Sequence, residues 1–169
     1  MATIAGDATV DQFTAALGDL DVGWTVTTAD ELPEALERFA EPIVGAPFPF
    51  EDLSLPDSIP RASASEDVKD ANTGVTAGVL AIAEYGSVVI GSQPLETELV
   101  SLYSDTHVAV VRAEDVVASM GEAFAEFGPR LREAGGNAIV ATGPSATADM
   151  GALVRGVHGP SDVHVVIVE

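Results

Sequence analysis

Small hydroxyl residues follow an apolar run near the C-terminal end of the chain. The run 137–141 leads into Gly143, and Ser145 and Thr147 come shortly after it. We expect the run to be a strand and residues 147–154 to be a helix, which places the hydroxyl groups at a strand-to-helix turn. The first N–H groups of a helix lack backbone partners and the helix dipole adds positive potential, so a phosphate or carboxylate would bind there. The alternative is an ordinary helix cap formed by Ser145 or Thr147, without a ligand.

Three ionisable residues in other expected loops could act as acid or base. Glu84 ends an apolar run, where a carboxylate could serve as a general base or clamp a substrate, and His158 lies next to a glycine in a loop, where an imidazole could transfer a proton. Asp149 could orient His158 or cap the expected helix. Ligands of open α/β sheets bind beyond the carboxyl ends of the strands, so we expect all three to face one cleft. The simpler alternatives are a solvated hairpin carboxylate for Glu84 and a loop histidine bonded to backbone carbonyls for His158.

The sequence holds no motif for a tightly bound metal or cofactor, and we expect neither. His107, His158 and His164 are the only histidines, but no His-Glu-x-x-His spacing occurs and His164 lies inside an apolar run. There is no cysteine, which excludes disulfides and a cysteine-ligated iron–sulfur cluster within this chain. The nucleophile elbow, the phosphate-binding P-loop and the dinucleotide fingerprint are also missing, so hydrolase, NTPase and nicotinamide-dependent activities lack their motifs.

Apolar spacing along the chain alternates between helical and strand periods, which predicts one α/β domain over residues 1–169. We expect a largely parallel sheet with helices on both faces. The expected helices lie near 9–20, after Glu31, from 114 to Gly128-Pro129, at 130–134 and at 147–154. The expected strands lie at 43–46, 107–112, 137–141 and 163–168, with a hairpin formed by 79–84 and 87–91 around Tyr85-Gly86.

A proline-rich segment near residues 47–65 interrupts this alternation. It carries few periodic apolar positions, so we expect a loop that crosses the surface rather than a separate domain. Its Phe48-Pro49-Phe50 motif would either attach the loop to the body of the domain or form an exposed patch for a partner. Attachment is the simpler of these two interpretations.

The composition is that of a folded but strongly acidic protein. The chain has 169 residues, 47% of them hydrophobic, with 27 acidic against 7 basic residues and a net charge of −20. Lys69 is the only lysine, and the excess of acids with small residues resembles intracellular proteins of extreme halophiles. A surface without a basic patch argues against nucleic-acid binding. No signal peptide or membrane-spanning apolar run is evident, so we expect a cytoplasmic protein.

Several of these residues also form short motifs that resemble a known family. Gly-Pro-Ser-x-Thr-Ala-Asp at 143–149 and Gly-Val-His-Gly-Pro at 156–160, with a histidine in the last apolar run, resemble the LUD domain family of the lactate-utilization protein C type. Gly-Val-Thr at 74–76 and Ala-Glu-x-Gly-Ser at 83–87 are similar to two further segments of that family. The resemblance covers roughly residues 71 to 169.

The chain departs from the family pattern at three places. The family has a basic residue where Ala146 stands and an acidic residue where Gly151 stands. The segment 101–107 lacks the Leu-Pro pair that the family has before its histidine. No basic side chain therefore stands at position 146 to hold an anion.

The resemblance implies both a fold and a set of ligand-binding residues. The fold would be the α/β sandwich of ribose-5-phosphate isomerase, glucosamine-6-phosphate deaminase and the CoA transferases. The ligand, a small anionic metabolite, would contact Thr76, Gly86, Gly143, Ser145 and Thr147.

The resemblance also implies a function. The chain would be a non-redox component of lactate utilization that acts with iron–sulfur partner proteins in the oxidation of lactate to pyruvate. A stand-alone enzyme and a regulatory module, either of which would bind a small phosphorylated or carboxylate metabolite, remain as alternatives. Both a monomer and a homo-oligomer are left open.

The net charge of −20 predicts a fold that gains stability from salt. Carboxylates repel one another over about 10 Å in dilute buffer, whereas molar salt shortens this range to about 3 Å. Thermal melts from dilute buffer to molar KCl should show a rising melting temperature. A melting temperature that does not change with salt would contradict the halophile interpretation.

Overall fold

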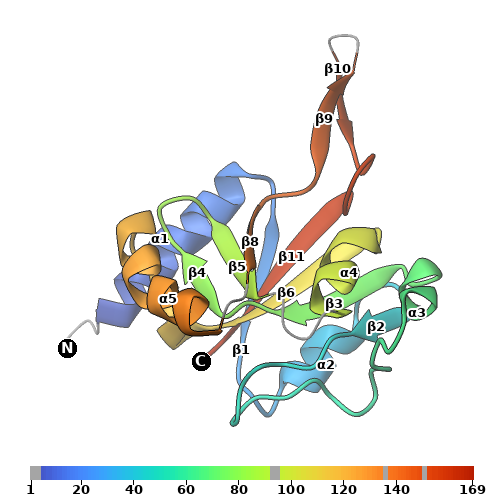
Figure 1. Ribbon diagram of the computed structural model, residues 1–169, viewed down its shortest axis with the longest axis horizontal. Coiled ribbons are helices and arrows are strands. Elements are labelled where there is room, and N and C mark those ends of the chain that lie inside the picture. The colour runs from blue at the N-terminus through green and yellow to red at the C-terminus, as the bar shows by residue number, and fades with distance from the viewer. Residues whose placement is uncertain (1–4, 92–95, 135–136, 150–151) are drawn as a thin grey trace.

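A five-stranded parallel sheet forms the centre of the computed structural model (Figure 1). The structure describes residues 5–91, 96–134, 137–149 and 152–169. The strand order is β1-β11-β6-β3-β2, and all four pairings are parallel. The five strands are β1 (Gly23–Thr27), β2 (Ile43–Gly45), β3 (Thr73–Ala77), β6 (Thr106–Arg112) and β11 (Asp162–Val168). The predicted α/β class with a parallel sheet is therefore confirmed.

A second, mixed sheet packs beside the first. Its order is β7-β4-β5-β8, with β4 antiparallel to β5, β5 antiparallel to β8 and β4 parallel to β7. The strands are β4 (Leu80–Ile82), β5 (Ser87–Gly91), β7 (Val116–Val117) and β8 (Ala138–Thr142). The predicted hairpin is present, but its turn spans the four residues 83–86, and Gly86 supplies the positive φ of 62°. Two of these pairings are antiparallel, so only the central sheet is wholly parallel.

Helices cover both faces of the central sheet. They are α1 (Ala5–Asp19), α2 (Leu32–Glu37), α3 (Ser65–Lys69), α4 (Glu96–Tyr103) and α5 (Met120–Ala134), with a 3₁₀ turn at Ala113–Asp115. Phe13 and Leu17 of α1 are fully buried in the core between the two sheets. Leu32 and Leu36 of α2 are buried in a second core on the opposite face of the central sheet. In the described ranges, no helix has the length and apolar character needed to cross a membrane.

The helix predicted from residue 114 to Gly128-Pro129 differs from the observed α5 at both ends. Val116 and Val117 form β7 because they pair with Ala81 and Ile82 of β4, so the helix begins only at Met120. It then continues through Pro129, which loses one helical hydrogen bond. The exposed pair Glu126–Arg130 bridges adjacent turns at this point, with its N and O atoms 3.4 Å apart.

The helix predicted at 147–154 is wrong, because this segment is a β-hairpin that projects from the body of the domain (Figure 1). Its strands are β9 (Ala146–Asp149) and β10 (Ala152–Arg155), and Thr147 lies opposite Val154. Hydrogen bonds close its base: the Ser145 N–H donates to the Pro160 carbonyl, and the Ser145 carbonyl accepts from the Gly156 N–H. Cross-strand pairing of β-branched residues thus outweighs a weak helical tendency. Gly151 lies outside the described residues.

The proline-rich loop is attached to the domain, as predicted. Leu53, Leu55 and Ile59 are buried in the core under α2, and Phe48 and Phe50 pack against it in half-buried positions. The hydrophobic effect therefore holds this loop against the central sheet along most of its length.

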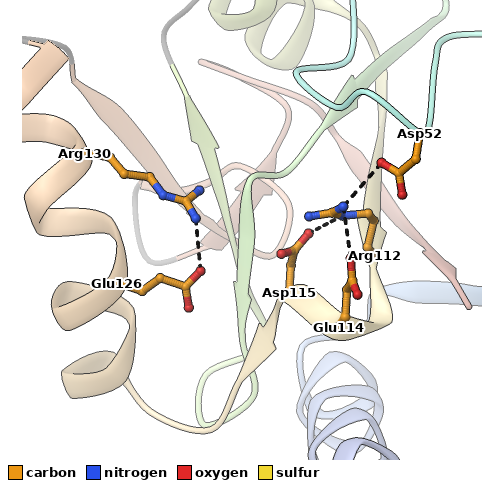
Figure 2. A network of polar contacts seen from close by, with 6 residues as sticks. All are labelled: Asp52, Arg112, Glu114, Asp115, Glu126 and Arg130. Carbon is orange, nitrogen blue, oxygen red and sulfur yellow. Dashed lines mark hydrogen bonds and ion pairs between the residues drawn. The ribbon is translucent and has the colours of Figure 1, made fainter.

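A charge cluster fixes the same loop to the end of β6. Arg112 forms ion pairs with Asp52 of the loop and with Glu114 and Asp115 of the following turn (Figure 2). Its guanidinium also lies 4.5 Å from the ring centroid of Phe50. The hydrogen bond to Asp115 raises the pKa of Arg112. One arginine thus holds three carboxylates and one aromatic ring in place.

Replacing Arg112 by alanine should lower the free energy of unfolding by about 2 kcal/mol, because the mostly buried Asp115 loses its partner and the contact with Phe50 is lost. The matched control is Arg130→Ala, which removes one exposed ion pair and should cost about 0.5 kcal/mol. Urea unfolding at constant salt measures both. Equal losses would show that the Arg112 cluster does not attach the loop.

Candidate functional site

A small cavity lies between the end of α1, the amino ends of β6 and β11, and the two turns that contain Gly86 and Gly143. Its volume is about 10 Å³, which is the space of about one water molecule. The residues that line it are Leu17, Val22, Gly86, Val88, His107, Ala109, Ala141, Gly143, Val163 and Val165. His107 is the one side chain in this set that carries a polar atom. The cavity therefore offers a single imidazole in apolar surroundings.

The imidazole of His107 is buried and forms a hydrogen bond with one neighbouring side chain. The side chain is 2% exposed, and its Nε2 lies 2.8 Å from the Oγ1 of Thr76. The second ring nitrogen, Nδ1, has no hydrogen-bond partner among the described residues. Burial lowers the pKa of His107 to about 4. The ring is therefore neutral at pH 7 and leaves one nitrogen for a small polar molecule.

Three of the five predicted ligand-binding residues meet at this imidazole. Thr76 is bonded to His107, and Gly86 and Gly143 line the cavity beside it. Both glycines have positive φ, 62° and 68°. A Cβ on Gly86 would lie 3.1 Å from the backbone of Ala16 in α1 and from the Leu20 side chain, so the turn packs this closely only without a side chain.

Sequence reasoning considered His107 only as a metal ligand and missed this arrangement. The signal was available, because His107 opens the apolar run 107–112, and a polar side chain on a buried strand needs a partner. Thr76 is the partner, since Gly74 lies opposite His107 in the β3–β6 pairing and Thr76 is two residues further along the same face.

The turn from Gly143 to Thr147 does not have the predicted form. No helix follows it, so the helix dipole that would attract an anion is missing. The Ser145 N–H is already bonded to the Pro160 carbonyl at 2.9 Å, and Thr147 lies in the projecting hairpin. Neither of these two residues lines the cavity at His107. Anion binding by Ser145 and Thr147 stays a prediction, although the strand-to-helix turn on which it was based is not present.

His158 lies in a second, open hollow. Residues 102–105 and 156–159 line this hollow, whose volume is about 390 Å³. The Tyr103 side chain is 69% exposed, and the side chains of Asp105 and His158 have no polar partner in the described part of the chain. The hollow lies at the amino edge of the central sheet. Asp105 and Ser161 directly precede β6 and β11, and the Ser161 N–H donates to the Asp105 carbonyl where these two parallel strands begin. The expectation that this loop lies at the carboxyl edge is therefore wrong.

The other two candidate catalytic residues lie on separate elements. Glu84 is exposed in the turn 83–86, where its N–H donates to the Ala118 carbonyl, and it lines neither cavity at this edge. Asp149 is the last residue of β9. It lies three residues beyond Ala146, which pairs with Arg155 at the base of the hairpin, so its backbone is about 10 Å from that base. Asp149 cannot cap a helix, because the segment is a strand. A shared cleft of Glu84, Asp149 and His158 stays a prediction.

The three histidines do not form one cluster. His107 and His164 point to opposite faces of the central sheet. Val108 lies opposite His164 in the β6–β11 pairing and shares its face, and the preceding residue His107 therefore points to the other face. His164 lies 2.9 Å from Thr25 Oγ1 and packs edge-on against Phe39, with ring centroids 5.0 Å apart. Burial, and then the charge of Arg38, lowers the pKa of His164. Across the described ranges, no group of three or more His, Asp or Glu side chains is arranged to hold a metal ion.

The burial of His107 predicts a specific pH dependence of stability. The unfolded chain takes up a proton near the ordinary pKa of 6.5, whereas the folded chain resists protonation down to about 4, so stability is lost as the pH falls through this window. The loss attributable to His107 is about 3 kcal/mol.

Comparing wild type with His107→Gln isolates this contribution from that of the carboxylates. The difference in unfolding free energy between the two proteins should shrink, or reverse sign, from neutral pH to about pH 4.5. The control His158→Gln changes an exposed ring and should keep the wild-type pH profile. A constant difference between wild type and His107→Gln would show that His107 is not buried in its neutral form.

The fold and the sequence of this chain are similar to those of known proteins. A crystal structure of a DUF162 family protein from Deinococcus radiodurans superposes with a TM-score of 0.76 over 99% of this chain and 100% of that one, at 22% identity. The lactate utilization protein C of Deinococcus radiodurans is 30% identical over 168 residues, which is 93% of this chain and 78% of that protein. The protein of the same name from Bacillus licheniformis is 36% identical over 107 residues. This second match spans only 44% of the length of the Bacillus protein.

The family assignment follows from the length of the match. The LUD domain matches residues 22–168, which include both sheets, His107, Thr76 and every residue that lines the cavity except Leu17. With this match and relatives named lactate utilization protein C, the chain belongs to the LUD domain family.

Proposed function

We propose that this protein is a non-redox component of lactate utilization and acts with iron–sulfur partner proteins in the oxidation of lactate to pyruvate. The observation that carries the proposal is the match to a lactate utilization protein C over 93% of the chain. Oxidation of lactate to pyruvate releases two electrons, which need an acceptor. The sequence has no cysteine, so a cluster held by cysteine thiolates would belong to another polypeptide. The proposal places the protein in the cytoplasm.

The geometry around His107 favours a component over a stand-alone lactate enzyme. The cavity has room for about one water, whereas lactate has six heavy atoms. A neutral imidazole also supplies no positive charge for a carboxylate. The Thr76–His107 hydrogen bond joins β3 to β6 within the central sheet, and it gives the site one buried polar position.

The hollow beside His158 is the observation that favours the second candidate, a module that binds a small metabolite. Its volume of about 390 Å³ falls within the range of small-molecule pockets. The carboxylate of Asp105 lines it, however, and would repel a phosphate or carboxylate. A small anionic metabolite at this place is therefore less well supported than the role in a multi-protein system.

Deleting the gene for this chain should abolish or strongly slow growth of the source organism on lactate as sole carbon source. Growth on pyruvate should remain normal, because pyruvate lies after the proposed step. Re-expression of the wild-type chain should restore growth on lactate. Undiminished growth of the deletion strain on lactate would contradict the proposal.

The partner part of the proposal has its own test. A tagged chain purified from lactate-grown cells should bring down a cysteine-rich protein with the visible absorption of an iron–sulfur cluster. The tagged chain from pyruvate-grown cells is the control. Loss of growth on lactate without any such partner would support the pathway and contradict the iron–sulfur association.

A further inference from the structure

The two edge strands of the central sheet differ in whether another segment of the chain covers them. At one edge, β2 is covered by the chain itself: Gly45 bridges to Arg61, and the Gly45 N–H and carbonyl bond to the Pro60 carbonyl and the Ala62 N–H. At the other edge, β11 is the one strand that pairs with β1 in the described part of the chain. Open edges of this kind attract further strands, and proteins usually protect them with charges, proline or a covering segment. The β1 sequence, Gly-Trp-Thr-Val-Thr, contains neither charge nor proline.

The outward backbone groups of β1 belong to Trp24 and Val26. The Thr27 carbonyl accepts from the Glu169 N–H, so Thr27 faces the β11 side of the strand. Successive residues of a strand direct their N–H and carbonyl groups to alternate sides, and Trp24 and Val26 therefore point away from β11. These groups have no partner among the residues that the structure describes. An added strand would find two donors and two acceptors here.

A groove runs along this open edge between β1 and α2. Its volume is about 560 Å³, and Thr25, Val26 and Thr27 form one side of it. The other side carries acidic residues of α2 and the residue that caps its N-terminus. These are Glu31, Glu34 and Glu37, all exposed.

Arg38 is the one basic residue among the described residues that line this groove. Its guanidinium donates to Thr25 Oγ1 at 2.7 Å and to the Ala35 carbonyl at 3.1 Å. Carboxylates therefore outnumber cations three to one along the groove.

The opposite face of the same edge is apolar. The side chains of Trp24 and Val26 are 43% and 47% exposed, although both belong to a strand of the main sheet. They lie on the α1 side of the sheet, because they pair with the inward-facing Val165 and Ile167. The edge thus presents apolar side chains on one face and acidic side chains on the other.

We propose that the open edge of β1 binds an extended strand of a partner polypeptide whose side chains alternate between apolar and basic. The apolar side chains would lie over Trp24 and Val26, and the basic side chains would face the glutamates of α2, since alternate residues of an added strand project to opposite faces. Charge selects this occupant over a second copy of the chain. A second copy would bring the same glutamates and a net charge of −20 to the interface. The inference is independent of the lactate assignment.

The single tryptophan of the chain makes the proposal directly measurable. A short, end-capped peptide that alternates lysine with valine should cover Trp24 and shift its fluorescence to shorter wavelength in a saturable manner. A peptide of equal length that alternates glutamate with valine is the control and should produce no shift. Binding of the lysine peptide should weaken as salt rises. No shift with the lysine peptide at low salt, or an equal shift with both peptides, would overturn the proposal.

Two variants separate strand pairing from charge. Val26→Pro removes an outward N–H, a change that edge strands accept, and should weaken binding by at least about tenfold while the melting temperature stays close to wild type. The triple variant Glu31→Gln, Glu34→Gln and Glu37→Gln should also weaken binding. Its matched control, Glu51→Gln with Glu66→Gln and Glu133→Gln, changes the net charge equally at exposed sites elsewhere and should bind as wild type. Equal weakening in the two triple variants would overturn the proposal.

Size-exclusion chromatography identifies the competing occupant. The wild-type chain should elute as a monomer at the concentrations used for fluorescence. A dimer that Val26→Pro dissociates, with Trp24 already shielded in the wild type, would assign the edge to a second copy and overturn the proposal.

Discussion

The pairing of β11 with its two neighbours is the interaction on which the rest of the structure depends. β11 lies between β6 and β1, so the last segment of the chain occupies an interior position of the central sheet. Its alternate residues enter both cores: Val165 and Ile167 face α1, while Val166 and Val168 face α2. Among the described strands β1 has no other partner, so its place in the sheet depends on β11. The long-range contacts that β11 makes therefore close the domain.

The same pairing determines where the polar groups lie. It brings Val163 beside His107, which closes the cavity on one side, and it brings the loop 156–161 against Asp105. Gly86 and Gly143 close the cavity from the second sheet, where Ser87 lies opposite Thr142. Burial of a neutral imidazole that is hydrogen-bonded to a threonine hydroxyl has a low free-energy cost, because neither group is charged and each has a partner. The core can therefore contain one imidazole without a buried charge.

The sequence predicted the elements whose apolar spacing is unambiguous. The strands at 107–112 and 163–168 and the helix near 9–20 are present because each buries a long, regular set of apolar residues. The helix predicted at 147–154 is wrong because this segment has no apolar stripe that would favour a helix. Its conformation depends instead on the hydrogen bonds of Ser145 with Gly156 and Pro160 at the base of the hairpin. β7 was missed for a similar reason, since two valines become a strand only beside β4.

For the candidate site as well, local motifs predicted individual residues but not how these residues come together. Thr76, Gly86 and Gly143 were predicted through short motifs, and they meet at His107. That meeting depends on the register of β3 against β6 and of β5 against β8, which no local pattern encodes. Glu84 and Asp149 were grouped with His158 because loops of open α/β sheets often gather at one edge, but Glu84 lies in a turn of the second sheet and Asp149 lies in the projecting hairpin.

The acidic surface and the open edge of β1 belong to one electrostatic arrangement. Arg112 gathers three carboxylates at the carboxyl edge, so local repulsion is neutralised where the loop must be held. Arg38 is the one cation beside Glu31, Glu34 and Glu37 among the residues that the structure describes. The field of these glutamates repels like-charged copies from a strand that has no charge of its own. Salt screens this field together with the repulsion that destabilises the fold. Conditions that favour the folded state thus also weaken the protection of the β1 edge, and its selectivity then rests on backbone pairing and on the fit around Trp24.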